Sequence, residues 1–232
     1  MAKKVDSLIN IKEIEESKYI VINARKDTLY QASILYSYIL TQHKKVSIFS
    51  DETDDRLSFL PWLEKIKETK IISADLEISS DIEILELYEF FKKNSIKINK
   101  KMATSFYAGF LHRYNNFVSY DCDGIVFAAL SELMAIGAEH KLCIEKMLQS
   151  VSLSMIRLKS LVFKNLLLED NAQVACVRVT DDDLISSGAS LEDVYEVAKE
   201  LLNLVHVKEV RVLKSDEKDK ILKIVKEVKI EK

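Results

Sequence analysis

The chain has 232 residues, and 48% of them are apolar or aromatic, which is enough for the buried core of one large domain or two smaller ones. Its 34 basic and 37 acidic residues give a net charge of -3 and are mixed along the sequence. Such a mixture creates no broad positive field, so long duplex nucleic acid is a poor partner. The sequence lacks an apolar run of signal-peptide or membrane-spanning length, and we therefore expect a cytoplasmic protein with no membrane insertion.

The cysteines and glycines exclude two further kinds of site. Cys122, Cys143 and Cys176 are widely separated and show neither a pairing pattern nor zinc-ligand spacing, so we expect reduced thiols. Only four glycines and one proline occur in the chain. A glycine-rich loop that cradles phosphate is therefore not available.

The first predicted elements form a parallel unit. Residues 19–23 and 46–49 are apolar runs typical of strands, and residues 29–40 carry the wide apolar face of a helix that packs on a sheet. A strand, a helix and a strand with short connections predict a right-handed parallel crossover. Residues 70–72 predict a third short strand, after which the chain is expected to run almost directly into a helix at Asp81.

Helices follow. Ile84, Leu87, Tyr88 and Phe91 are spaced so that all four lie on one stripe of a helix. Further helices are predicted over residues 101–113, 123–136 and 142–151, the second of them with Asp121 or Asp123 as its cap.

A second unit is predicted towards the end of the sequence. A connector helix bears Met155, Leu158, Val162 and Leu166, and a strand covers residues 173–179. Ser190 to Asp193 resembles a capping box at the start of a helix that continues to Leu204, and a strand covers residues 209–213. The tail stays open: Ile221, Ile224, Val225 and Val228 have helical spacing, whereas residues 226–230 alternate like an edge strand.

The corner after the first strand is the most informative motif. Residues 23–33 read Asn-Ala-Arg-Lys-Asp-Thr-Leu-Tyr-Gln-Ala-Ser and pass from the strand into a helix. A divalent-metal phosphoesterase would place its first carboxylates and a histidine here, but Asp27 is the single candidate ligand.

The sequence resembles the DHH phosphoesterase superfamily, in its RecJ-like and nanoRNase-type branch with a DHH-associated C-terminal domain. The resemblance rests on this corner, on the segment Ala103-Thr-Ser-Phe-Tyr-Ala-Gly-Phe-Leu111 and on residues 174–213. The resemblance implies an α/β fold: a shortened parallel-sheet domain with a helical half at residues 1–150, a connector helix at 151–168 and a small, truncated α/β domain at 169–232.

The sequence departs from the pattern of that family at its metal-ligand positions. Asn23 stands where the family has histidine, Leu29 where it has the second aspartate, and Arg113 where it has a later one. The Asp-His-His signature and the Gly-Gly-Gly-His loop are missing. Two divalent ions need several carboxylates to offset their mutual repulsion, so we predict a degenerate metal site. We expect Arg113 or Lys26 to neutralise Asp27, with the alternative that Arg113 points to solvent.

Other charged clusters have simpler interpretations. Residues 51–55 are expected to form a solvated acidic loop, and Thr180 to Asp183 to cap a short helix. Lys100 and Lys101 end a basic run that could meet a short oligonucleotide or phosphate together with Lys26, although a solvated helix end explains the run as well.

Together these features predict a phosphoesterase-family protein without catalysis or cofactor, which binds a protein partner or a second copy of itself. The alternative is a Mn²⁺- or Mg²⁺-dependent phosphodiesterase that acts on short oligonucleotides or cyclic dinucleotides.

Overall fold

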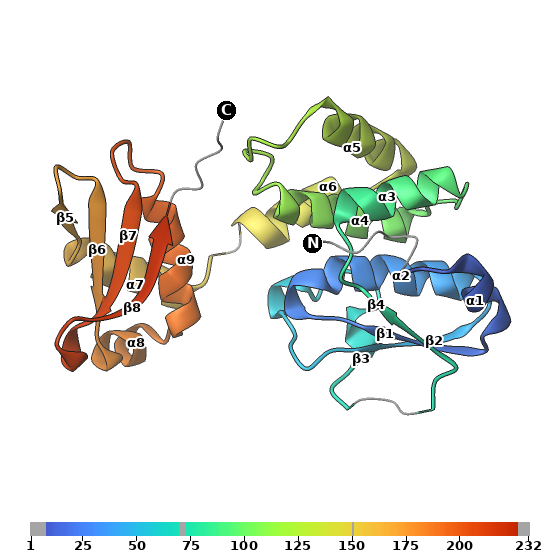
Figure 1. Cartoon of the computed structure of the whole chain (residues 1–232), viewed down its shortest axis with the longest axis horizontal. Helices are drawn as coiled ribbons and strands as arrows, with labels where there is room; N and C mark the ends of the chain where they lie inside the picture. Colours follow the sequence, from blue (N-terminus) through green and yellow to red (C-terminus); the bar gives the residue numbers. More distant parts are fainter. Residues whose placement is uncertain (1–7, 70–72, 150, 227–232) are drawn as a thin grey trace. The chain divides into compact units, whose positions relative to one another are not determined.

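The structure is a computed structural model that describes residues 8–69, 73–149 and 151–226. The chain divides into two compact units, Met1–Ser150 and Val151–Lys232 (Figure 1). Each unit contains a four-stranded sheet with helices packed on it, so the fold is α/β.

The sheet of the first unit is parallel throughout, with the strand order β3-β2-β1-β4. Its strands are β1 (Tyr19–Asn23), β2 (Lys45–Phe49), β3 (Ile66–Lys67) and β4 (Leu76–Ser79). Ile20, Val21 and Ile22 of the central strand β1 are fully buried, as expected for a strand flanked by two neighbours and covered by a helix. The helix between β1 and β2 is α2 (Leu29–Thr41), so the predicted parallel crossover is confirmed.

The prediction for the region after β2 was wrong in part. Residues 70–72, the predicted third strand, lie outside the described residues. The chain does not pass directly into a helix at Asp81, because β4 intervenes and pairs with β1, and α3 begins only at Ile84. Asp75 fixes the start of β4: its carboxylate accepts hydrogen bonds from the backbone N–H groups of Lys18 and Tyr19. Because β4 has only four residues, its alternation of apolar and polar residues is too short to be recognised within the polar sequence around it.

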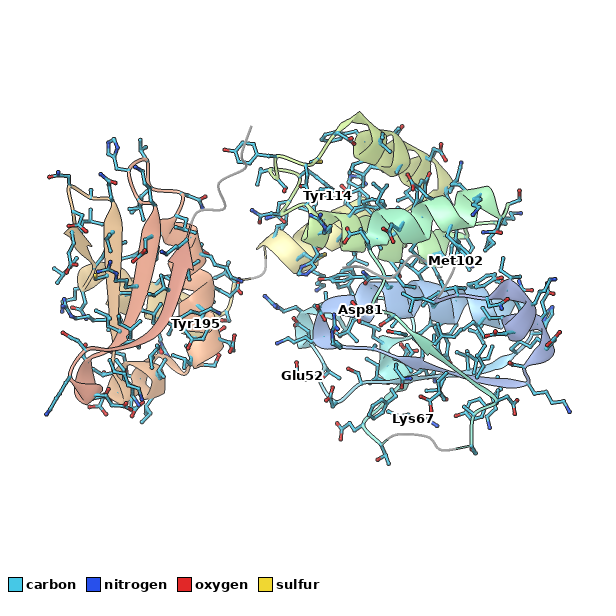
Figure 2. The ribbon with its side chains drawn as sticks, in the orientation of Figure 1. Glu52, Lys67, Asp81, Met102, Tyr114 and Tyr195 are labelled. Carbon is cyan, nitrogen blue, oxygen red and sulfur yellow. The ribbon has the colours of Figure 1, made fainter. Side chains whose placement is uncertain are left out.

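Of the remaining helices of this unit, α3, α5 and α6 pack against α4, which itself packs on α2 (Figure 1). They are α1 (Ile11–Glu16), α3 (Ile84–Lys93), α4 (Lys100–Arg113), α5 (Gly124–Ile136) and α6 (His140–Ile144), which continues as a wider turn over Glu145–Gln149. Met102 and Tyr114 mark the two ends of α4 in Figure 2, and the residues between them are almost all buried. Of the two predicted caps of α5, the structure selects Asp123, whose carboxylate accepts hydrogen bonds from the N–H groups of Ile125 and Val126.

The second unit has a mixed sheet in the order β5-β6-β7-β8, in which β6 and β7 are parallel and the outer pairs are antiparallel. Its elements are α7 (Leu153–Lys164), β5 (Leu167–Glu169), β6 (Val174–Val179), α8 (Asp181–Ser187), α9 (Leu191–Leu201), β7 (Glu209–Lys214) and β8 (Lys220–Lys226). Thr180 with Asp183 and Ser190 with Asp193 form the capping boxes of α8 and α9. Tyr195 of α9, labelled in Figure 2, lies 4.2 Å beneath the Lys223 ammonium of β8.

The structure also bears on the predicted connector and on the tail of this unit. The segment expected to be a separate connector belongs to the core of the second unit, since Leu158 and Val162 of α7 are buried there with β6 and α9. The open question about the tail is answered for residues 220–226, which form the strand β8. Residues 227–232 lie outside the described residues.

Among the helices that the structure describes, none combines the length and the apolar character needed to cross a membrane.

Candidate functional site

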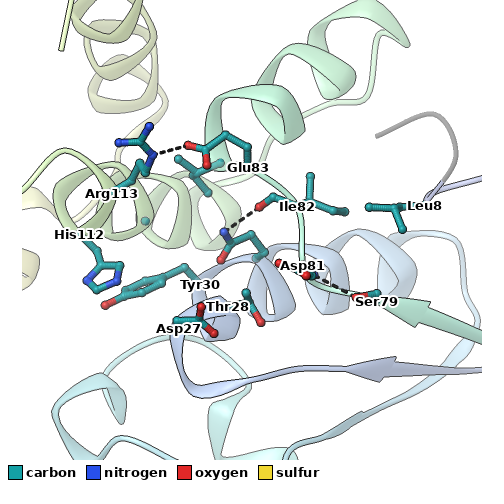
Figure 3. Close-up of a pocket in the computed structure, with 13 residues that line it drawn as sticks. Leu8, Asp27, Thr28, Tyr30, Ser79, Asp81, Ile82, Glu83, His112 and Arg113 are labelled. Carbon is teal, nitrogen blue, oxygen red and sulfur yellow. Dashed lines mark hydrogen bonds and ion pairs between the residues drawn. The ribbon is translucent and has the colours of Figure 1, made fainter. Parts of the chain in front are cut away.

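A pocket of about 540 Å³ opens where β1 and β4 end (Figure 3). In open α/β sheets, ligands bind outside the carboxyl ends of the strands, so this is the place where the fold favours a site. Its walls come from the turns after β1 and β4 and from α2, α3 and α4. The pocket is lined by Leu8, Asp27, Thr28, Tyr30, Gln31, Ser79, Asp81, Ile82, Glu83, Ile84, Gly109, His112 and Arg113.

Local hydrogen bonds fix the corner that carries Asp27. After β1 ends, the hydroxyl of Thr28 accepts a hydrogen bond from the Arg25 N–H at 3.0 Å and closes a short 3-10 turn. The same hydroxyl shares a hydrogen bond of 2.7 Å with the Ser80 hydroxyl, just beyond β4. The ends of the two parallel strands are therefore tied together by two small buried hydroxyl residues.

Arg25 bridges two carboxylates at this corner. Its Nη1 and Nη2 donate to both oxygens of Asp81, at 3.0 and 2.9 Å. Its Nε and Nη2 donate to both oxygens of Asp27, at 3.2 and 3.3 Å. The hydrogen bonds to Asp27 and then to Asp81 raise the pKa of the Arg25 guanidinium, which stays charged. A planar guanidinium suits this double fork, which an ammonium could not make.

Arg113, on the opposite wall, also lies between two carboxylates. Its Nε forms an ion pair with Glu83 Oε1 at 2.7 Å (Figure 3). Its Nη2 donates to Asp121 at 2.8 Å. Arg113 therefore does not neutralise Asp27, which pairs with Arg25 instead; Arg113 is exposed, as the alternative had it, but bound to two other carboxylates.

Between the two arginine clusters the pocket wall is aromatic and polar. The rings of Tyr30 and His112 stack with their centroids 5.0 Å apart. Burial raises the pKa of the Tyr30 phenol, which keeps it neutral. The side-chain amide of Gln31 donates to the Ile82 carbonyl at 2.9 Å. This wall offers π surface and hydrogen-bonding groups.

Comparison with known proteins identifies solved structures with a similar fold. No protein-family model matches the sequence, and no curated protein does so either. The solved structure of an exopolyphosphatase-related protein from Bacteroides fragilis is similar to the chain with a TM-score of 0.74, over 90% of this chain and 79% of that one, at 16% identity. The chain has an exopolyphosphatase-like fold.

A second similar structure is a candidate family II inorganic pyrophosphatase from Methanococcus jannaschii, with 13% identity over 84% of this chain and 83% of that one. Its TM-score of 0.36 is too low to support an argument. At these identities the likeness to the exopolyphosphatase-related protein concerns the fold alone, so the chemistry of the site must come from the residues present.

Those residues do not fit a pair of divalent ions. Asn23 uses its amide to donate to Glu77 at 3.0 Å, and Leu29 is fully buried in the core. Asp27 and Asp81, the two carboxylates at the corner, are both bound by Arg25. Within the described parts of the chain, no group of three or more histidine, cysteine or acidic residues could hold a metal ion. Oxygen-ligated divalent ions need more free carboxylates than this corner offers.

The three lysines considered for phosphate binding lie apart from the pocket lining. Lys100 pairs with Glu139 at 2.5 Å, and the Lys101 ammonium lies 3.8 Å above the Trp62 ring. Lys26 is exposed in the turn before α2. The structure does not assemble them into one site.

Sequence reasoning missed Arg25 and Asp81 as partners. Arg25 follows β1 and Asp81 follows β4, and residues that follow neighbouring parallel strands meet at one edge of the sheet. The position of Arg25 and Asp81 directly after two strands is visible in the sequence only if β4 is predicted. Without β4, Asp81 is predicted to lie at the start of a helix.

Proposed function

We propose that this protein is a degenerate member of the DHH phosphoesterase superfamily that acts by binding, as part of an assembly, without a two-metal centre. The observation that carries the proposal is the Arg25 side chain bound to both Asp27 and Asp81. A single internal cation thus occupies Asp27, the one carboxylate at a ligand position of the family, together with its neighbour Asp81.

Electrostatics support this proposal. Two like unit charges 4 Å apart repel by about 4 kcal/mol at an effective dielectric constant of about 20, and exposure to solvent reduces the effect. A divalent ion entering beside Asp27 would meet this repulsion from Arg25 and would also have to compete with it for the carboxylates. Arg113, where the family has an aspartate, adds a second positive charge to the pocket wall.

The charge of the pocket also bears on its ligand. The lining contains three carboxylates, from Asp27, Asp81 and Glu83, and each is paired with a guanidinium, from Arg25 or Arg113. Because both guanidinium groups are already bound to carboxylates, the pocket offers little attraction to a phosphate or an oligonucleotide. The earlier prediction of a phosphate ligand stays a prediction without support from this pocket.

Metal binding and turnover test the proposal in the purified full-length chain. We expect equilibrium dialysis against Mn²⁺ to give much less than one ion per chain, and no hydrolysis of bis(p-nitrophenyl) phosphate above the level of Asp27→Asn. Arg25→Met should increase Mn²⁺ binding, because it frees two carboxylates. The matched control Arg178→Met removes a half-buried arginine of the second unit that pairs with Asp219, and it should leave Mn²⁺ binding unchanged.

Two Mn²⁺ ions per wild-type chain, together with turnover that Asp27→Ala abolishes, would overturn the proposal. That result would establish the competing metal-dependent phosphodiesterase, whose action on short oligonucleotides or cyclic dinucleotides could then be measured.

A further inference from the structure

A buried amide oxygen in the wall of the pocket lacks a hydrogen-bond partner. Gln31, on α2, lines the pocket and is 8% exposed. Its Nε2 donates to the Ile82 carbonyl at 2.9 Å, whereas its Oε1 is buried and meets no donor among the described residues. A buried carbonyl oxygen without a donor has lost its water and gained nothing in exchange, which is unfavourable. The pocket therefore favours a ligand that brings an N–H group to this oxygen.

We propose that the pocket binds an alkylammonium group, which is an –NH₃⁺ head on a short apolar stem, either from a free amine or from the lysine side chain of another protein. The inference rests on the proposed function, because it requires a pocket that holds no pair of divalent ions. It goes beyond that function by naming the chemistry of the ligand.

The charges around the pocket favour a cation. The two arginine clusters contain two guanidinium groups and four carboxylates, those of Asp27, Asp81, Glu83 and Asp121. Three of these carboxylates belong to the pocket lining. Two negative charges thus remain in excess after every arginine has been counted. A concave site with an excess of one sign of charge attracts ligands of the opposite sign.

The unpartnered oxygen lies close to this negative charge. The Gln31 amide is hydrogen-bonded to the backbone of Ile82, and the residues on either side of Ile82 are Asp81 and Glu83 (Figure 3). All four residues line the pocket. A single head group in this part of the pocket can therefore meet a neutral carbonyl oxygen together with carboxylate oxygens.

The bonds already made at the corner favour an ammonium over a second guanidinium. Arg25 binds both oxygens of Asp27 and both oxygens of Asp81, so neither carboxylate has a free edge for another planar fork. An ammonium is a compact charge whose N–H groups each need only one lone pair. A carboxylate oxygen that accepts one hydrogen bond from Arg25 keeps a further lone pair for it.

The rest of the lining suits an apolar stem. Leu8, Ile82 and Ile84 contribute aliphatic side chains, and the stacked rings of Tyr30 and His112 also line the pocket. The volume of about 540 Å³ leaves room for several methylene groups beside the head. Methylene groups gain free energy when such surfaces remove them from water, and a cation near an aromatic face gains further attraction.

Ligand-observed NMR on the full-length chain at neutral pH tests the proposal, with n-pentylammonium as the probe. For so small a ligand we expect a dissociation constant of about 1 mM. 1-Pentanol has the same stem without the charge and should bind about tenfold more weakly or less. The methylamide of Nα-acetyl-lysine carries the same head on a peptide unit. Its binding at least as tightly as the amine assigns the site to a protein lysine, and weaker binding assigns it to a free amine.

Matched variants locate the binding site. Gln31→Met keeps the length of the side chain but removes the acceptor, and Glu83→Gln removes one carboxylate. Each should weaken the binding of n-pentylammonium about fivefold or more. Gln42→Met, at the other end of α2, and Glu89→Gln, exposed on α3, lie outside the pocket lining and should leave the binding unchanged. Unchanged circular dichroism would show that the variants fold, and Glu83→Gln keeps the test decisive if Gln31→Met does not.

The absence of saturable n-pentylammonium binding would overturn this inference, and so would binding that neither pocket variant weakens. Dialysis against Mn²⁺ on the same preparation separates this failure from failure of the proposed function. A chain that binds neither the amine nor Mn²⁺ would refute the alkylammonium ligand and leave the proposed function intact, whereas two Mn²⁺ ions per chain would overturn both.

Discussion

At the scale of single residues, the corner after β1 shows how one side chain can occupy two carboxylates. Arg25 reaches both Asp27 and Asp81 because the turns that follow two neighbouring parallel strands lie side by side. The three side chains are about 60% exposed, so the cluster stabilises the fold only modestly. Its main effect is on what the carboxylates can bind, since both already have a cationic partner.

A double-mutant cycle measures this pairing. For Arg25→Ala, Asp27→Ala and the double variant, urea unfolding should give a coupling of about 0.2–1 kcal/mol. The coupling should shrink at about 1 M salt, where the screening length falls to roughly 3 Å. The matched cycle of Arg113→Ala with Asp27→Ala should be additive within about 0.5 kcal/mol, because Arg113 pairs with other carboxylates. A larger coupling for Arg113 than for Arg25 would contradict the arrangement described here.

At the scale of elements, the contact between α2, α3 and α4 positions the far wall of the pocket. Gly109 of α4 lies where these helices meet, and a side chain there would press on Ile84 and Tyr30. A Cβ atom there would be 2.7 Å from Ile84 Cδ1 and 3.2 Å from Tyr30 Cβ. The hydroxyls of Ser33 and Ser105 share a hydrogen bond of 2.8 Å across the same pair of helices, α2 and α4. Small residues thus let α4 bring His112 and Arg113 to the pocket.

Gly109→Ala should therefore destabilise the protein by about 1–3 kcal/mol, since the added methyl group overpacks a tight contact. Gly124→Ala is the matched control, because no atom lies within 4 Å of its Cβ position and alanine favours a helix. The control should be neutral or more stable by up to about 1 kcal/mol. Urea unfolding of both variants checks the pair, and equal destabilisation would argue against the close approach at Gly109.

At the scale of the whole molecule, the fold resembles that of the exopolyphosphatase-related protein, whereas the residues at the corner do not fit a metal pair. The fold of the first unit is stabilised by an apolar core. In this core Phe91, Phe106 and Phe110 are fully buried among aliphatic side chains, and such packing does not depend on an ion. The stability of the chain should thus be independent of divalent metal.

Thermal unfolding in EDTA and in millimolar Mn²⁺ should give the same midpoint. A ligand that binds only the native state at a hundred times its dissociation constant would add about 2.7 kcal/mol, which a melting curve would detect. In Arg25→Met, a small upward shift in Mn²⁺ is expected, because the freed carboxylates can bind the ion weakly. A loss of stability in EDTA for the wild-type chain would contradict a metal-free fold.

The sequence by itself determined the local features of this protein. The apolar run of residues 19–23 predicted β1, the spacing of Ile84, Leu87, Tyr88 and Phe91 predicted α3, and Asp123, Thr180 and Ser190 marked helix starts that the structure confirms. Each of these signals depends on neighbours within a few residues, such as hydrogen bonds to nearby N–H groups or a shared helical face.

Tertiary structure alone decided which charges meet. β4 is too short for its pattern to be recognised, so the sequence did not reveal that Asp81 lies at the same sheet edge as Arg25, 56 residues away along the chain. In the same way, α5 carries apolar residues on nearly all its sides, so its sequence does not show which face is buried. Contacts between distant residues depend on strand order and on helix packing, and these are fixed only when the whole core assembles.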